Sequence, residues 1–161
     1  MRNILITFLF VSSLNSTDYI DYLHPFHPTK SKEGMVVSQS ALSSDIGVKI
    51  LDMGGNAVDA AVAVGFSLAI TLPRAGNLGG GGFMVIHLVE SGETITIDYR
   101  EMAPSAAKTD MFLDTSGEVD NKKARYSIYS SGIPGTVAGL LHAHERFGKL
   151  SLAEIIQPAI D

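Results

Sequence analysis

Hydrophobic residues return at helical intervals soon after residue 40, and this pattern predicts the first helix of the chain. Spacings of three and four positions place one apolar face toward the interior, formed by Leu42, Ile46, Ile50 and Met53. Ser40 or Ser43 is suited to cap the start of this helix by accepting a free backbone N–H. Gly54-Gly55 supplies the left-handed residue that commonly ends a helix.

A second and more apolar helix is predicted over residues 57–70. Asn56 is suited to cap its start, with Asp59 three residues later near the positive end of the helix dipole. The segment is apolar nearly all round, so we expect a buried layer, with close packing at Ala60, Ala61, Val64 and Leu68. Leu72-Pro73 should end the helix, because proline lacks an N–H and disfavours helical geometry in the residue before it.

Strand patterns follow at residues 83–89 and 94–99, and a shorter β-like run lies at residues 35–38. The two longer runs flank a four-residue turn at 90–93 in which Gly92 suits a tight hairpin. Such a hairpin needs another element over at least one face.

The apolar pattern gives way to a polar segment over residues 105–120, and helical patterns return near the end of the chain. Pro134 suits the first turn of a helix running through residues 137–147, closed by Gly148. Ser151 is expected to cap a last helix that starts at Leu152. The order of helix, helix, hairpin, loop, helix and helix predicts an α+β fold.

The first residues have the layout of a secretory signal peptide. Arg2 precedes an apolar run at residues 4–11 and small polar residues up to Ser16. The run is well short of the ~20 apolar residues that cross a bilayer, so we expect no stable membrane insertion and an exported, periplasmic or secreted protein. A disordered or misassigned N-terminus is the alternative. Residues 17–33 then form an extended leading segment, and residues 34–161 the body.

The amino-acid composition limits the kinds of molecule that the chain is expected to bind. With 161 residues and a net charge of -5, the chain has no basic excess for nucleic-acid binding, and small molecules are the expected ligands. Zero cysteines exclude disulfides and thiolate metal sites. The histidine pairs at 24/27 and 142/144 lack metal-site context, so we predict neither a metal nor a cofactor.

A glycine-rich loop at residues 76–82 joins the second helix to the hairpin. Its four consecutive glycines permit positive φ and close backbone approach. A phosphate loop would need Lys and Ser or Thr next, where Phe83-Met84 stand, and a dinucleotide loop would join a strand to a helix. An anion-binding role and a structural role both remain open.

Arg100 stands where the second strand ends, between Asp98 and Glu101. A guanidinium there could bind a carboxylate in bidentate fashion. The alternative is a salt bridge to Asp98 or Glu101.

Four motifs together resemble the γ-glutamyltransferase family, also called glutathione hydrolases. They are GGNAVDAA at residues 54–61, AGNLGGGGFM at 75–84, DYREMAP at 98–104 and GIPGTVAG at 132–139. Their order and spacing match over roughly residues 26–161, in the N-terminal part of that family's large subunit.

The resemblance implies part of an N-terminal nucleophile hydrolase, a four-layer αββα sandwich that is incomplete in this chain. In that family a precursor cuts itself into large and small subunits and exposes a threonine nucleophile, which cleaves γ-glutamyl amides such as glutathione through a γ-glutamyl-enzyme intermediate. The group passes to water, amino acids or peptides. Arg100 matches the arginine that holds the α-carboxylate of the γ-glutamyl group, and the glycine loop would pack beside the pocket.

The resemblance carries over no catalytic residue, since the nucleophilic threonine and the oxyanion donors lie beyond the matched part. Thr71, Thr94, Thr96 and Thr136 stand at none of the family's cleavage positions. We therefore expect a truncated product, a partial sequence or one piece of a larger enzyme, inactive and poorly folded without the small subunit. A relative of the cephalosporin acylases and a non-catalytic binding remnant are the alternatives.

Overall fold

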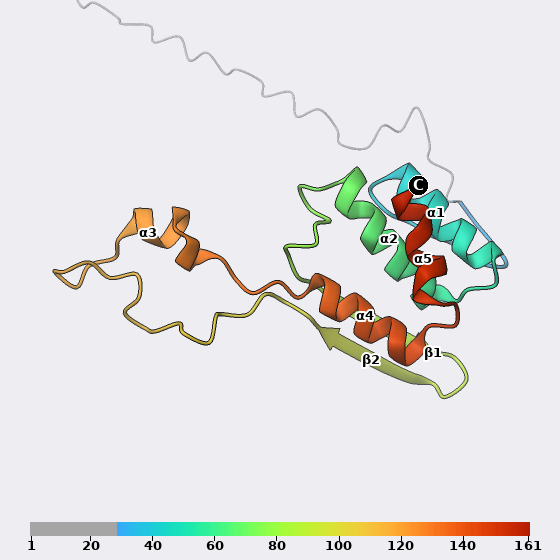
Figure 1. Ribbon diagram of the computed structural model, residues 1–161. Helices are drawn as coiled ribbons and strands as arrows, with labels where there is room; N and C mark the ends of the chain where they lie inside the picture. The colour runs from blue at the N-terminus through green and yellow to red at the C-terminus, as the bar shows by residue number, and fades with distance from the viewer. Residues whose placement is uncertain (1–28) are drawn as a thin grey trace, which may run out of the picture. The chain divides into compact units, whose positions relative to one another are not determined.

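The computed structural model describes residues 29–161 (Figure 1). The predicted signal peptide at residues 1–16, and most of the extended leading segment with His24 and His27, lie outside the described residues. Residues 29–33 belong to no helix or strand, and residues 33–161 form one compact unit.

The unit contains five α-helices, one short 3-10 helix and one hairpin. Their bounds are α1 (Ala41–Asp52), α2 (Ala57–Thr71), β1 (Phe83–Leu88), β2 (Glu93–Asp98), α3 (Asn121–Tyr126), η1 (Ile128–Ser130), α4 (Thr136–Phe147) and α5 (Leu152–Ile160). Helices and an antiparallel hairpin in this order give the mixed α+β architecture that the sequence predicts.

Ser40 is the N-cap of α1, and its side chain accepts a hydrogen bond from the Ser43 N–H. Beyond the end of the helix, Gly54 has φ +89°. The predicted buried face was wrong in part, because Leu42 and Met53 are exposed. Ile50 is buried as predicted, and the other buried positions are Ser43 and Gly47. Small side chains on this face let α1 approach α2 closely, and a methyl group on Gly47 would lie 2.8 Å from Val64.

Helix α2 is the centre of the helical part and contacts α1, α4 and α5 (Figure 1). Asn56 caps it with a complete capping box, and Leu72 ends it, both as predicted. Seven of its fifteen residues are buried, while Ala57, Ala61 and Ile70 are exposed, so the prediction of burial all round was too broad. With its neighbours it forms a core of Ile50, Val58, Ala60, Val62, Ala63, Ile86, Leu140, Ala143 and Ile155.

Strands β1 and β2 pair antiparallel, with Phe83 opposite Asp98 and Leu88 opposite Glu93. Gly92 has φ +71°, as the predicted tight turn requires. Side chains alternate between faces: Ile86 and Ile97 pack on the core, while Phe83 is exposed. Helix α4 contacts β2 and covers the inner face (Figure 1).

The β-like run at residues 35–38 forms no strand, which corrects the prediction. The described residues offer it no partner strand, and its contacts are with α1 instead. The Ser38 N–H donates to Ser44 Oγ at 3.0 Å, and Val36 packs against the core.

Helix α3 and the 3-10 helix η1 follow the polar segment, and the sequence pattern predicted neither. Asp120 caps α3 by accepting the N–H groups of Lys122 and Lys123, each at 3.0 Å.

The prediction for Pro134 is also corrected. Pro134 precedes α4 instead of entering its first turn, because Gly135 is the N-cap and Thr136 the first helical residue. Ser151 caps α5 with a capping box, as predicted.

Candidate functional site

The glycine-rich loop, the end of β2 and the loop before α4 meet at one place. Gly82 and Tyr99 exchange two backbone hydrogen bonds, with N···O distances of 3.3 and 3.0 Å. The Gly80 carbonyl accepts from the N–H groups of Gly135 and Thr136 at 2.8 and 3.0 Å. Three motifs separated along the sequence therefore enclose the backbone on either side of Arg100.

A backbone bridge between Met102 and Ile133 closes the far side of this junction. Its two N–H···O bonds measure 3.1 and 2.8 Å. The chain segment between these residues, which carries α3 and η1, leaves and returns at this bridge (Figure 1).

The glycines of the loop allow the neighbouring backbone to approach closely, and they are not needed for a left-handed backbone conformation. Among the described residues, positive φ occurs at Gly54, Gly92 and Gly117, none of which lies in the loop. A methyl group on Gly81 would lie 2.7 Å from the Glu101 nitrogen and 2.8 Å from Arg100 Cα. Real Cβ contacts of this kind do not form, so the loop needs glycine in order to pack against the residues around Arg100.

Arg100 projects from the end of β2 with its side chain 62% exposed. Its Nε lies 3.3 Å from Glu101 Oε2, and its guanidinium carbon lies 5.8 Å from the centre of the Phe83 ring. Of the two acidic neighbours, Glu101 forms the salt bridge, while Asp98 accepts the backbone N–H of Arg100 at 3.0 Å.

This arrangement leaves donors of Arg100 for a ligand. Within residues 29–161, the polar contact of the guanidinium uses Nε. The two Nη groups can then donate to the two oxygens of a carboxylate, which is the geometry in which arginine binds carboxylates most strongly.

The electrostatics keep Glu101 in the form that pairs with Arg100. A hydrogen bond from its own backbone N–H lowers the pKa of Glu101, and Arg100 lowers it further. Beside it, burial raises the pKa of Tyr99. At neutral pH Glu101 is therefore ionised and Tyr99 is a neutral phenol.

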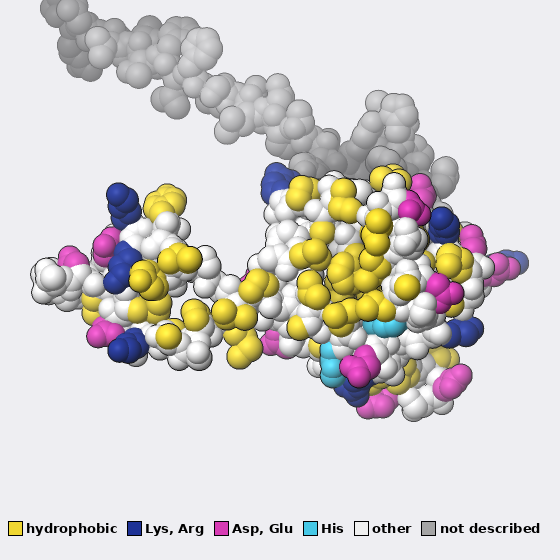
Figure 2. All heavy atoms as spheres, viewed as in Figure 1, with side chains coloured by type: hydrophobic (Ala, Val, Ile, Leu, Met, Phe, Trp, Pro, Cys, Tyr) yellow, Lys and Arg dark blue, Asp and Glu magenta, His cyan; other side chains and the backbone are white. Residues whose placement is uncertain are grey.

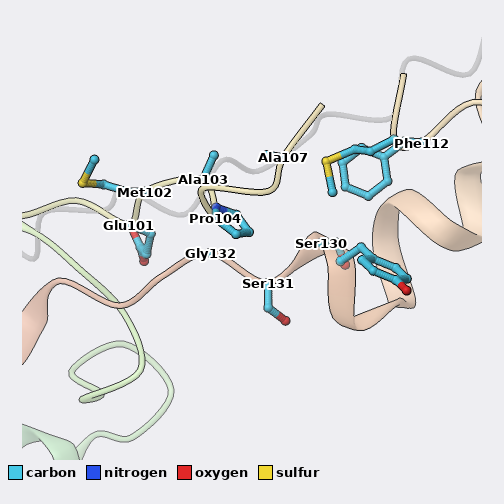
Figure 3. A pocket seen from close by; sticks show the side chains of 11 residues that line it. Glu101, Met102, Ala103, Pro104, Ala107, Phe112, Ser130, Ser131 and Gly132 are labelled. Atoms are coloured by element: carbon cyan, nitrogen blue, oxygen red, sulfur yellow. The ribbon is translucent and has the colours of Figure 1, made fainter. Parts of the chain in front are cut away.

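A shallow pocket of about 240 Å³ lies next to Glu101. Figure 3 shows Met102, Pro104 and Phe112 on one side and Ser130, Ser131 and Gly132 on the other. Arg100 is not among its lining residues. The pocket is mainly apolar, and its hydroxyl-bearing lining residues are Tyr129, Ser130 and Ser131.

The first motif of the resemblance, at residues 54–61, lies outside this junction and has a structural role. Asp59 is fully buried and accepts the N–H groups of Asn56, Lys149 and Leu150. It links the start of α2 to the connection between α4 and α5. His142 is exposed, whereas His144 contacts the Leu150 carbonyl at 2.8 Å.

The described residues also bear on metal sites and on membrane spans. Over residues 29–161, no three His, Cys, Asp or Glu side chains gather in a way that would hold a metal ion. None of the helices in that range combines the length and apolarity needed to span a bilayer.

The profile of the Gamma-glutamyltranspeptidase family matches residues 43–161. The chain belongs to this family. The glutathione hydrolase proenzyme of Escherichia coli strain K12 is 55% identical over 134 residues, which cover 83% of this chain and 23% of that protein. The chain thus spans about a quarter of that relative's length.

Solved gamma-glutamyltranspeptidases confirm the predicted fold. The crystal structure of the Helicobacter pylori gamma-glutamyltranspeptidase superposes with a TM-score of 0.78 at 47% identity, covering 83% of this chain and 38% of that one. The chain is therefore part of an N-terminal nucleophile hydrolase fold. The Acylase ACY 1 proenzyme of Pseudomonas sp. strain V22 is less similar, at 38% identity over 139 residues, 83% of this chain and 25% of that protein.

The sequence singled out Arg100 and left Asp98 and Glu101 open as its partner, but it missed Tyr99. Tyr99 lies between Gly82 on one side and Gly135 and Gly139 on the other. A signal was present, since Gly135 and Gly139 stand four residues apart and so face the same side of α4.

Proposed function

We propose that this chain is part of a glutathione hydrolase that cleaves γ-glutamyl amides such as glutathione. The reaction runs through a γ-glutamyl-enzyme intermediate and passes the group to water, an amino acid or a peptide. Arg100 holds the α-carboxylate of the substrate. The threonine nucleophile comes from a part of the precursor outside these 161 residues.

The observation that carries the proposal is the state of Arg100. Its guanidinium is exposed, pairs with Glu101 through Nε at 3.3 Å, and keeps both Nη groups for a ligand carboxylate. The backbone on both sides is held by the glycine loop and the loop before α4. An arginine that binds a ligand must be exposed, and the backbone from which its side chain extends must be held in place.

The family relationships support a γ-glutamyl substrate over the acylase alternative. Identity is higher to the Escherichia coli glutathione hydrolase than to the acylase, 55% against 38%. A non-catalytic binding remnant is the second alternative, and it predicts glutamate binding without turnover.

We further propose that the enzyme is exported and works with the small subunit of the same precursor.

The first prediction concerns Arg100→Ala in the full-length precursor. Losing hydrogen bonds to a charged group should raise KM for a γ-glutamyl anilide by roughly 10- to 100-fold. The KM of Arg100→Lys should lie between those of wild type and Arg100→Ala, because lysine keeps the charge but loses the planar fork of the guanidinium. Steady-state release of the anilide measures both variants.

Arg146→Ala is the matched control for this experiment. Arg146 is likewise exposed and stacks over a phenylalanine ring, with its guanidinium carbon 4.7 Å from the centre of Phe147, but it lies near the end of α4. Its KM should stay at the wild-type value. An unchanged KM in Arg100→Ala would mean that Arg100 serves only its salt bridge to Glu101.

A further inference from the structure

The side chain of Tyr99 occupies a slot whose walls are glycines. A methyl group on Gly139 would overlap the Tyr99 ring, and one on Gly82 would lie 2.9 Å from it. A methyl group on Gly135 would overlap the Tyr99 carbonyl oxygen. We call Gly82, Gly135 and Gly139 the glycine slot.

The backbone of Tyr99 is held as closely as its ring. Its N–H donates to the Gly82 carbonyl at 3.0 Å, and its carbonyl accepts the Gly82 N–H at 3.3 Å. Helix α4 contributes Gly139 and its N-cap contributes Gly135, and the N–H groups of Gly135 and Thr136 both donate to the Gly80 carbonyl. Tyr99 is therefore clamped between the hairpin and α4.

Arg100 has few contacts of its own to define its direction. Successive residues at a strand end point to opposite faces, so the inward placement of Tyr99 directs Arg100 outward, toward Phe83. Among residues 29–161, the side chain of Arg100 contacts Glu101 and Phe83. The direction of the Arg100 side chain is therefore set mainly by the backbone, which Tyr99 anchors.

We propose that Tyr99 is a positioning residue for substrate recognition, which the glycine slot fixes so that Arg100 meets the α-carboxylate. This inference rests on the role proposed above for Arg100. It makes the specificity of the enzyme for substrates with a free α-carboxylate depend on a residue that does not bind the substrate.

The test compares two substrates in the full-length enzyme. One is a γ-glutamyl anilide, and the other is the same anilide with its α-carboxylate replaced by a carboxamide. The ratio of their kcat/KM values measures carboxylate recognition alone, because a general loss of folding or activity lowers both values equally. Arg100→Ala sets the full size of the effect, roughly a 10- to 100-fold fall in the ratio.

Tyr99→Ala should lower the same ratio by roughly 10-fold, since small misplacements of a binding group reduce rates strongly. Gly139→Ala should act in the same direction by displacing the ring. Tyr99→Phe should keep the wild-type ratio, because the ring remains and the hydroxyl makes only a 3.5 Å contact with the Phe83 carbonyl. If Tyr99→Ala does not fold, Tyr99→Leu is measured in its place.

Ile97→Ala is the matched structural control. Ile97 is the preceding inward residue of β2 and packs against the core. This variant should lower the melting temperature and leave the substrate ratio unchanged.

The outcomes separate the two proposals. If Arg100→Ala changes the ratio and Tyr99→Ala, or its Leu replacement, leaves it unchanged, the positioning role of Tyr99 is wrong and the role of Arg100 stands. If Arg100→Ala itself leaves the ratio unchanged, both are wrong. A fall in the ratio for both variants, without one in Ile97→Ala, supports the inference.

Discussion

At the scale of single residues, Asp59 shows how a fully buried carboxylate is stabilised. Its oxygens accept the backbone N–H of Asn56 at 2.9 Å, that of Lys149 at 3.0 Å and that of Leu150 at 3.3 Å. His144 Nε2 lies 3.7 Å away. Because buried charges are costly unless they are hydrogen-bonded, Asp59 holds the connection between α4 and α5 in a single position on α2.

Asp59→Ala is therefore expected to destabilise the protein by about 3 kcal/mol or more, since it leaves several backbone N–H groups buried without an acceptor. Denaturant unfolding of the full-length precursor measures the change. Asp45→Ala, at an exposed position of α1, is the control and should stay within about 0.5 kcal/mol of wild type. Equal unfolding midpoints for the two variants would contradict this account of Asp59.

At the scale of elements, capping decides where the helices begin. Ser40, Asn56, Asp120 and Ser151 each accept backbone N–H groups at the start of a helix. In α5 the capping box is reciprocal, with the Ser151 N–H donating to Glu154 Oε2 at 2.8 Å. The Ser151 hydroxyl lowers the pKa of Glu154.

The lowered pKa gives the capping box of α5 a pH dependence. A carboxylate whose pKa is lower in the folded state adds stability above its unfolded pKa of about 4.3. That stability is lost as the pH falls through the lower folded value. The melting temperature of Glu154→Gln should therefore lie below wild type at pH 7, and the difference should shrink below about pH 4.

Thermal melting of both proteins from pH 7 to pH 3 measures this difference. Glu145→Gln, an exposed substitution within α4, is the control and should show no comparable trend. A difference between wild type and Glu154→Gln that stays constant over the whole range would contradict the capping explanation.

At the scale of the whole molecule, the described residues expose many large apolar side chains. Figure 2 shows hydrophobic side chains at the surface of the helical part and around α3. The outer face of the hairpin exposes Phe83 and Val85, and the segment around α3 exposes Tyr126 and Ile128. Surfaces of this kind are commonly covered by other protein, and the relatives have several times more chain than is matched here.

We expect residues 17–161, purified alone, to bind a hydrophobic dye strongly, to melt without a cooperative transition and to release no anilide from a γ-glutamyl substrate. The reason is that their apolar surfaces lack cover and that we propose the nucleophile to lie outside them. The full-length precursor is the control. A cooperative melt together with anilide release by the isolated residues would refute this prediction.

Local patterns predicted most of the elements. The caps at Ser40, Asn56 and Ser151 and the turn at Gly92 were predicted correctly, because each depends on residues within four positions of one another. The run at 35–38 was predicted wrongly, since a strand exists only with a partner. Helix α3 was missed because its six residues carry no apolar period.

By itself, the sequence determined most of the helix boundaries, the hairpin, the family resemblance and the choice of Arg100 as a candidate, since these depend on local chemistry and motif order. Only the tertiary structure decided that Glu101 rather than Asp98 pairs with Arg100, and that the glycine loop needs close approach rather than positive φ. It alone brought Tyr99 between the hairpin and α4. Residues about 40 positions apart meet there, and no local pattern specifies which backbones will touch.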